Sequence, residues 1–288
     1  MAQSRDTYAS VARVLESPDA PYHNRDFDVF LQGSYKNNTN IYGDSDVDIV
    51  IRQKSCFYYN IDKLSDAEKS EFRRVHHNPA EYTLVDFKRE VAAWLAYNYK
   101  ADFDDKGGKA LYIKARDNRR NADVLVAAQH KVFSAYPNSA NQVFMEGVMF
   151  LPKSGGSTVN YPKQHKRNLT AKHQETKEWL KPTVRAFKNM RNRAVEEGLL
   201  REGVAPSYYI EGLLFNAPLG AFNTDMQTTV ASCLSWAVAT DRSKLPCGNY
   251  YHWLVRDNEK TSWPVADCDA YLDAMVKLWG GWGRPQRF

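Results

Sequence analysis

Two aspartates separated by a single residue lead directly into an apolar run, and this arrangement limits the chain more than any other feature. They are Asp46 and Asp48 in the segment 46–51, whose remaining residues are valine and isoleucine. Such a run predicts a strand, so both carboxylates should lie on one face and the aliphatic side chains on the other. Adjacent carboxylates repel one another, and their burial without a cation is costly. The pair therefore predicts a divalent metal, and oxygen ligands at this spacing suit Mg²⁺ bound jointly with phosphates.

A calcium-binding EF-hand is the first alternative, because Asp44, Asp46 and Asp48 match the first, third and fifth positions of its loop. The loop also requires a glycine at its sixth position and a glutamate at its twelfth. Ile49 and Ser55 occupy those two positions here. The EF-hand interpretation is therefore excluded.

A Gly-Ser pair stands twelve residues before the first aspartate of this strand. Gly33 and Ser34 end an apolar run at 28–34, which predicts a strand closed by a turn. A glycine lets the backbone approach a ligand closely, and a serine offers a backbone N–H and a hydroxyl to a phosphate. Alone, such a pair is usually an ordinary turn. Followed by spaced aspartates ahead of an apolar strand, it is the pattern of nucleotidyltransferases.

The segment 31–51 resembles the signature of the cGAS/DncV-like nucleotidyltransferases, which belong to the polymerase-β-like superfamily. Most bacterial members make cyclic di- or trinucleotide signals in antiphage defence. The resemblance implies a core of mixed sheet and helices joined to a helical second lobe, with the active site in the cleft. It implies that Asp46 and Asp48 are catalytic and bind two Mg²⁺ ions, with Mn²⁺ as a substitute. It also implies that Gln32, Gly33 and Ser34 contact the substrate.

The family also requires a third carboxylate on a neighbouring strand, and the best match is Asp123. This residue opens the apolar run 123–127 shortly after another predicted strand at 110–115. The resemblance implies that Asp123 touches the metal and helps to activate the attacking hydroxyl. Asp102, Asp104 and Asp105 are its rivals, in a polar stretch predicted to be a loop.

The second half of the chain carries residues that resemble the helical lobe of the same family. Lys181, Arg185 and Lys188 recur at helical spacing and are predicted to form one basic face of a helix. The resemblance implies that Lys188 and Ser207 bind the donor triphosphate and that Tyr208 stacks on a base. Because a second tyrosine follows directly, one of the two is expected to pack in the core.

The chain is predicted to divide into an α/β part at 1–155 and a helical part at 156–288. Residues 1–150 hold 20 basic and 21 acidic side chains, whereas 151–288 hold 19 and 13. A basic half beside clustered aspartates suggests an anionic ligand that is bound with metal. Residues 1–20 are expected to contain the first helix of the chain, and this helix is expected to be able to pack on the helical lobe. Further elements are expected at 5–16, 82–99, 163–198, 207–216, 225–240 and 267–279 (helices) and at 43–51 and 144–151 (strands).

Asn160, in the connector between the two parts, can both donate to and accept from a base edge. In the cyclic-dinucleotide clades that the sequence resembles, an asparagine here goes with acceptance of a pyrimidine. UTP and ATP are therefore the expected substrates, with purine-only products as the alternative. The other interpretation makes Asn160 an ordinary turn residue. No zinc-binding insertion is present, so no nucleic-acid activator is expected, and the protein is predicted to be a monomer.

Several classes of protein are excluded by what the sequence lacks. Its uncharged runs are shorter than the roughly 18 apolar residues of a membrane span, and no apolar secretory segment is expected. The four cysteines form no C-x-x-C pair, which favours a reducing cytoplasm over a disulfide framework. Two other functions stay open. One is nucleotide transfer to an RNA end, as in poly(A)- or CCA-adding enzymes, and the other is a catalytically silent nucleotide-binding or antitoxin module.

Overall fold

The computed structural model describes residues 2–41 and 46–281 of the 288-residue chain, which separates into two compact units. The first consists of the residues up to Tyr35 and of Asp46–Pro162. The second consists of Lys36–Ser45 and of the chain from Lys163 onward. The unit boundary thus follows Pro162 and not residue 155. The segment that begins at Lys36 belongs with the helices, although nothing in the sequence suggested that it does.

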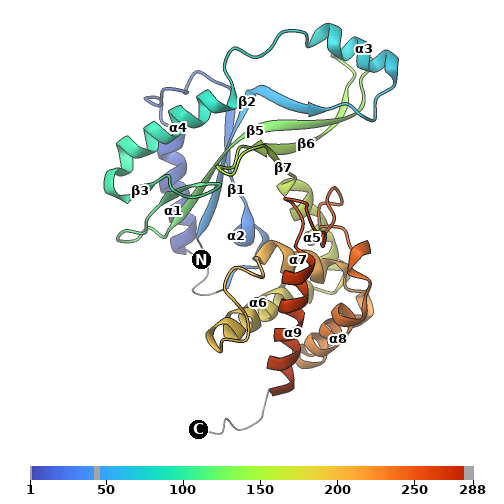
Figure 1. Cartoon of the computed structure of the whole chain (residues 1–288). Coiled ribbons are helices and arrows are strands. Elements are labelled where there is room, and N and C mark those ends of the chain that lie inside the picture. Colours follow the sequence, from blue (N-terminus) through green and yellow to red (C-terminus); the bar gives the residue numbers. More distant parts are fainter. Residues whose placement is uncertain (1, 42–45, 282–288) are drawn as a thin grey trace. The chain divides into compact units, whose positions relative to one another are not determined.

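The first unit is built on a mixed sheet in which two long parallel strands, β2 and β5, lie side by side (Figure 1). The order of its main path is β1-β2-β5-β4-β3, and β6 and β7 form an antiparallel branch beside β5. Residues with high strand propensity dominate the long strands, which is why they extend well past the predicted runs. The strands are β1 Phe27–Leu31, β2 Val47–Asn60, β3 Phe103–Asp104, β4 Leu111–Ile113, β5 Ala122–Ala135, β6 Val143–Phe150 and β7 Thr158–Asn160.

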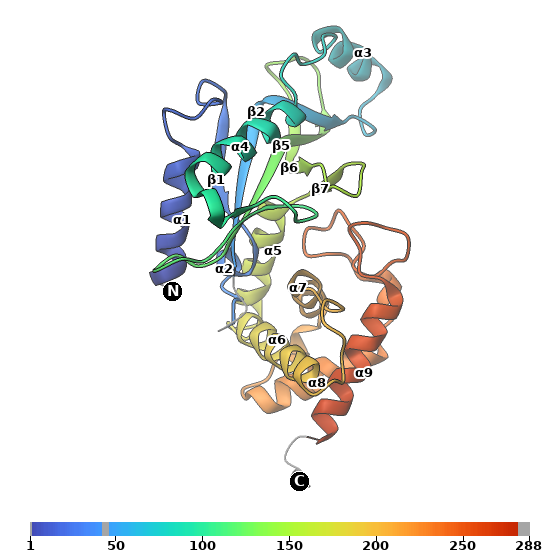
Figure 2. The ribbon, with the colours of Figure 1, turned by 60° about the vertical axis from the view of Figure 1, so that its left-hand side comes forward.

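One face of this sheet packs against α1 (Ala2–Leu15) and α4 (Leu84–Tyr99), which contact one another (Figure 2). A capping box of Thr83 and Asp86, each side chain accepting from the other's backbone N–H, begins α4. The helices predicted at 5–16 and 82–99 are confirmed. The first helix belongs to the first unit, and its Val11 and Leu15 are buried in the core of that unit.

A separate aromatic core lies where the far ends of β2, β5 and β6 meet α3 (Asp66–Val75) (Figure 1). Phe72 of α3 is fully buried there, with its ring 5.0 Å from the rings of Phe133 and Tyr136. This helix was not predicted. Most of its residues are polar and Phe72 is the one that is buried, so no apolar periodicity marks it.

The second unit is mainly helical, and its helices share one hydrophobic core. The single helix expected at 163–198 is two helices, because Lys177 and Glu178 adopt positive φ angles of 49° and 68° that interrupt the helical path. No helix in the described residues is long and apolar enough to span a membrane. The helices are α5 Pro162–Glu175, α6 Leu180–Glu196, α7 Ser207–Asn216, α8 Met226–Ala239 and α9 Val265–Gly281, with short 3₁₀ turns η2 Leu219–Ala221 and η3 Arg242–Lys244, and η1 Lys100–Asp102 in the first unit.

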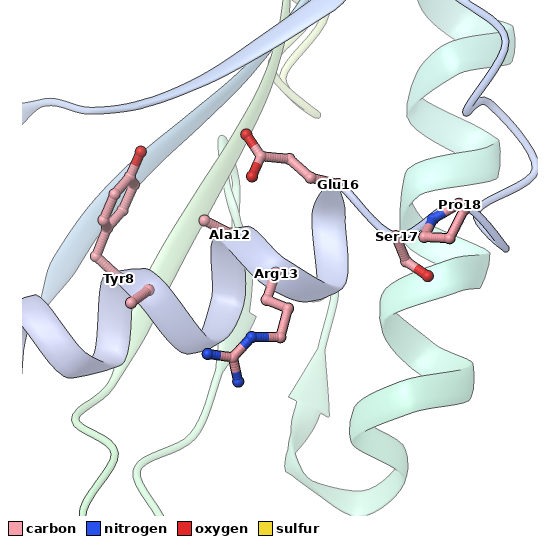
Figure 3. A pocket seen from close by; sticks show the side chains of 7 residues that line it. Tyr8, Ala12, Arg13, Glu16, Ser17 and Pro18 are labelled. Carbon is pink, nitrogen blue, oxygen red and sulfur yellow. The ribbon is translucent and has the colours of Figure 1, made fainter.

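An open cavity of about 560 Å³ runs along α1 and the turn that follows it (Figure 3). Tyr8, Arg13 and Glu16 line it together with small side chains. The helix α1 packs on the sheet face opposite to the one that bears the predicted acids. The cavity therefore lies apart from those acids.

Candidate active site

The predicted acidic residues come together on the sheet face opposite to α1 and α4. Asp48 on β2 and Asp123 on β5 are direct neighbours in the parallel register. Both side chains are half-buried, and Asp46 is exposed one residue before β2 begins. Ile49 and Val124, the next residues along each strand, are fully buried in the core with the two helices. The predicted alternation of carboxylates and aliphatic side chains is therefore confirmed within the described residues. Part of the predicted strand, residues 43–45, lies outside them.

Asp123 lies next to Asp48 in the strand register, where the third carboxylate was expected. The pKa of its carboxyl is raised, first by burial and then by the negative charge of Asp46, so these two groups lie near one another. Among its rivals, Asp102 forms an ion pair of 3.0 Å with Arg119. Asp104 lies on β3 and not in a loop as predicted, two strands away from Asp123.

Gly33 is required by its own backbone and by the carboxylate beside it. Its φ of 69° lies in the left-handed region that favours glycine. A Cβ at this position would overlap Oδ2 of Asp48, so any side chain here would have to displace that carboxylate. The N–H of Gln32 donates to the Asp48 carbonyl at 3.0 Å. Gly33 and Ser34 then open a short helix, α2 (Gly33–Asn37), where the sequence predicted a turn. The Gly-Ser motif and the aspartate motif are therefore in direct contact.

The carboxylates at this site have the chemistry that a hard divalent cation requires. Mg²⁺ is usually held by one or two carboxylates and takes its remaining ligands from water and substrate phosphates. Asp48 and Asp123 supply two carboxylates on adjacent strands, and Asp46 adds a third nearby. Across residues 2–41 and 46–281, no three His, Cys, Asp or Glu side chains are grouped closely enough to hold a metal ion by themselves. This donor set fits a cation that completes its coordination on a nucleotide.

A second charged cluster lies in the helical unit, and we call it the Glu211 network. Glu211 and Lys188 are 2% and 1% exposed and form an ion pair of 2.8 Å. The Asn37 amide and His165 Nε2 each lie 3.0 Å from the carboxylate, and the Thr39 hydroxyl donates to it. Lys188 also donates to the Thr39 carbonyl at 3.1 Å. Burial opposes the charge of Glu211, but the charge of Lys188 and the hydrogen bonds with His165 and Lys188 outweigh burial and hold the pKa of Glu211 far below its ordinary value.

The Glu211 network shows where Lys188 lies. This lysine was expected on one basic helix face and to bind the donor triphosphate, and in the structure its ammonium is buried among protein oxygens. The signal was in the spacing, because Leu180, Val184 and Lys188 recur every four residues and all three are buried on α6. Glu211 drew no prediction, although a glutamate among the apolar residues of α7 indicates a buried partner.

The other two residues predicted in the helical lobe lie at the start of α7. Ser207 is half-buried, and its hydroxyl accepts from Arg191 at 3.2 Å. The Tyr208 ring packs on His165 with 4.8 Å between centroids, and its hydroxyl accepts from the Asn249 amide at 3.1 Å. Burial raises the pKa of Tyr208. The tyrosine that follows stacks on a buried tryptophan, so both tyrosines are packed where one was expected to be.

Asn160 is a strand residue and not a turn residue. It ends β7 opposite Val148 of β6. Val148 packs with Val50 and Leu125, which stand two residues after Asp48 and Asp123 on the same strand faces. The Asn160 Oδ1 accepts from the Tyr161 N–H at 2.9 Å, so within the part of the chain that the structure describes its amide N–H groups are the donors left for a ligand.

Comparison with known proteins agrees with the nucleotidyltransferase family that the sequence motifs resemble. The model of the cGAS/DncV-like nucleotidyltransferase C-terminal helical domain matches residues 167–280. A cyclic UMP-AMP synthase of Rhodothermus marinus is 38% identical over 258 residues, which are 89% of this chain and 86% of that protein. The cyclic nucleotide synthase CdnE01 of Staphylococcus haemolyticus is 33% identical over 260 residues, 88% and 85% of the two chains.

A solved structure shows that the fold is shared over almost the whole length. The Rhodothermus marinus CdnE c-UMP-AMP synthase with Apcpp and Upnpp has a TM-score of 0.85 and 34% identity, and the match covers 99% of this chain and 94% of that one. The predicted fold, a nucleotidyltransferase core with a helical lobe, is thereby confirmed. The chain belongs to the cGAS/DncV-like nucleotidyltransferases.

Proposed function

We propose that this chain joins nucleoside triphosphates into a cyclic dinucleotide without a template, as a signal in bacterial antiviral defence. The observation that carries the proposal is the register of Asp48 and Asp123 on adjacent parallel strands, with Asp46 beside them. A catalytically silent relative is expected to have lost one of the three acids, and this chain retains all three on one face. The similarity to proteins named cyclic nucleotide synthases supports the same activity.

The proposed reaction consists of two equivalent steps. In each step a ribose hydroxyl oxygen bonds to an α-phosphorus, the bond from that phosphorus to the β-phosphate oxygen breaks, and pyrophosphate leaves with the electron pair. The hydroxyl proton passes to a carboxylate or to water. The first step gives a linear dinucleotide, and the second closes the ring. Catalysis of this kind depends mainly on positioning and on charge neutralisation.

The residues divide this work between them. Gly33 permits the close approach of backbone to phosphate, and Ser34 offers an N–H and a hydroxyl. Asp46, Asp48 and Asp123 would hold two Mg²⁺ ions, which when bound supply charge neutralisation of the triphosphate and a more acidic attacking hydroxyl. Asp123, the neighbour of Asp48 in the strand register, would both touch the metal and help to activate the attacking hydroxyl.

The proposed substrates are ATP and UTP. A Rhodothermus marinus relative, 38% identical, is named a cyclic UMP-AMP synthase. Asn160 supports a pyrimidine because its free amide N–H groups can donate to a base carbonyl. Other relatives are named dipurine and dipyrimidine synthases at 29% and 33% identity, so the base preference is the part of the proposal that most needs a test.

The test is incubation of the purified chain with four radiolabelled NTPs and Mg²⁺, followed by phosphatase treatment and chromatography. A phosphatase-resistant product that disappears when UTP or ATP is omitted supports the proposal, and an undiminished product without UTP contradicts the pyrimidine. Nuclease treatment should leave the rate unchanged, because we propose that a monomer works without a nucleic-acid activator. Extension of added RNA in place of a small cyclic product would favour the RNA-end reaction.

A further inference from the structure

Tyr112 extends the row of site residues beyond Asp123. It lies on β4 directly opposite Asp123 in the antiparallel register of β4 and β5. On its other side it lies opposite Asp104 of β3. Asp48, Asp123, Tyr112 and Asp104 therefore form one cross-strand row over four adjacent strands, which are spaced about 4.8 Å apart.

The side chain of Tyr112 projects from the same face as the carboxylates. Leu111 and Ile113, its neighbours in β4, are buried in the core with α1 and α4. Because successive residues of a strand alternate, Tyr112 points to the opposite face, where Asp123 also lies. The same reasoning applies to Asp104, since Phe103 before it packs on the helix-side core. The charges of Asp46, Asp123 and Asp104 all act on the Tyr112 hydroxyl, which agrees with this placement.

Tyr112 lies on the side of Asp123 that is away from the phosphate motif. Gly33 follows β1 and contacts the Asp48 carboxylate, so a triphosphate held by Gly33 and Ser34 lies toward the β1 side of the row. Asp123 separates this side from Tyr112. A second nucleotide whose hydroxyl is presented to Asp123 therefore has Tyr112 next to it.

The Tyr112 hydroxyl is chemically available for such a contact. Its side chain is half-buried, and no residue in the described ranges, 2–41 and 46–281, forms a hydrogen bond with this hydroxyl. A phenol can donate to a ribose hydroxyl while that hydroxyl donates in turn to a neighbouring carboxylate.

We propose that Tyr112 is a binding residue of the acceptor nucleotide, donating a hydrogen bond to the ribose whose hydroxyl attacks. The assignment rests on the proposed function and names the side chain that holds the second substrate. The contact would orient the attacking hydroxyl next to Asp123 without contributing to the binding of the donor triphosphate.

The experiment compares Tyr112→Phe with Tyr97→Phe, a control on α4 whose side chain is 73% exposed. Initial rates of pyrophosphate release are measured with ATP varied at saturating UTP, and the reverse. Loss of one neutral hydrogen bond corresponds to about a three- to tenfold change in affinity. We expect the Phe variant at 112 to raise KM for one nucleotide by this factor, with KM for the other within about twofold. The control should change neither. Tyr112→His, which restores a ring N–H donor, should recover part of the loss.

Binding of non-hydrolysable ATP and UTP analogues separates this proposal from the proposed function. If the wild-type chain releases no pyrophosphate but Tyr112→Phe still weakens binding of one analogue, the contact stands and the activity is wrong. If the wild-type chain is active and Tyr112→Phe leaves both KM values and both binding constants unchanged, the contact is wrong. If the unfolding temperature of Tyr112→Phe lies well below that of the Tyr97→Phe control, Tyr112 is structural. This result would equally overturn the assignment.

Discussion

Asp123 and Glu211 are carboxylates in the two units of one protein, and their surroundings move their pKa values in opposite directions. Burial and the charge of Asp46 raise the pKa of Asp123. For Glu211, Lys188 and a set of hydrogen bonds overcome burial and lower the pKa. The first carboxylate is held in a position where its charge is unfavourable to the fold, and the second in one where its charge is required by the fold.

The difference separates groups that serve a ligand from groups that serve the structure. Glu211 has its cation and its donors built in, so it has no capacity left for a substrate. Under the proposed function, Asp123 gains a favourable partner when a cation and a nucleotide bind. Perturbed carboxylates with raised pKa values are therefore better guides to the active site than buried ion pairs, although both look unusual.

The largest expected effect comes from Asp48→Asn, which tests whether the sheet-face charge serves catalysis alone. Loss of one anionic ligand should abolish product formation, with a fall in rate of at least about 10³-fold, while the free energy of unfolding stays equal or rises because repulsion is relieved. Turnover assays and thermal unfolding check both parts. Asp105→Asn, an exposed site outside the row, is the control and should leave both quantities unchanged. An unfolded Asp48→Asn variant would make this aspartate structural.

Glu211→Gln tests whether the buried carboxylate of the helical unit stabilises the fold. It leaves the Lys188 ammonium buried without a counter-charge, which should lower the free energy of unfolding by about 3–5 kcal/mol. Chemical denaturation measures this change. The double variant Lys188→Met with Glu211→Gln should lose less than the sum of the two single changes, because the two charges depend on one another. Simple additivity would contradict an ion pair that stabilises the fold.

Gly33→Ala sharpens the comparison by disturbing the acid site without changing its charge. A methyl group would meet Oδ2 of Asp48 and displace it, and a displacement of about 1 Å commonly costs about 10²-fold in rate. Gly155→Ala is the matched control. Gly155 also has a positive φ, but a Cβ added there would meet nothing within 4 Å. Both should lose about 1–2 kcal/mol of stability from backbone strain. Equal activity of the two variants would show that the contact with Asp48 is unimportant.

Asp123→Asn should give the smallest effect on stability and the opposite sign to Glu211→Gln. Because the folded-state pKa of Asp123 is raised above 3.8, its ionisation costs stability above that raised pKa, and the cost disappears as pH falls toward 3.8. The variant should therefore be more stable than the wild type at pH 7 by less than about 1 kcal/mol. The difference should vanish in unfolding measurements near pH 3.5. A destabilised variant at pH 7 would mean that the charge of Asp123 has a structural partner.

The sequence predicted the acid site better than the helical lobe, for physical reasons. Strand alternation and an apolar run were enough to place Asp48 on one strand face, because both depend on local pattern. Asp123 was chosen from the family resemblance together with the apolar run that it opens. The Glu211 network depends on Asn37 and Thr39, whose partner lies more than 170 residues away in the chain, and no local pattern encodes such a contact. The helix α3 was missed because a single buried phenylalanine gives no periodicity.

The contact of Asn37 and Thr39 with Glu211 also bears on how the protein is made. Their hydrogen bonds join residues 174 and 172 positions apart, so they form only after most of the chain has left the ribosome. Until then the segment before Asp46 has no partner from α7 to hold it. Contacts of such long sequence separation slow folding, because loop closure precedes any gain from the contact. A helical unit expressed from Lys163 onward would lack both residues, and its buried Lys188 and Glu211 would lose the groups that enclose them.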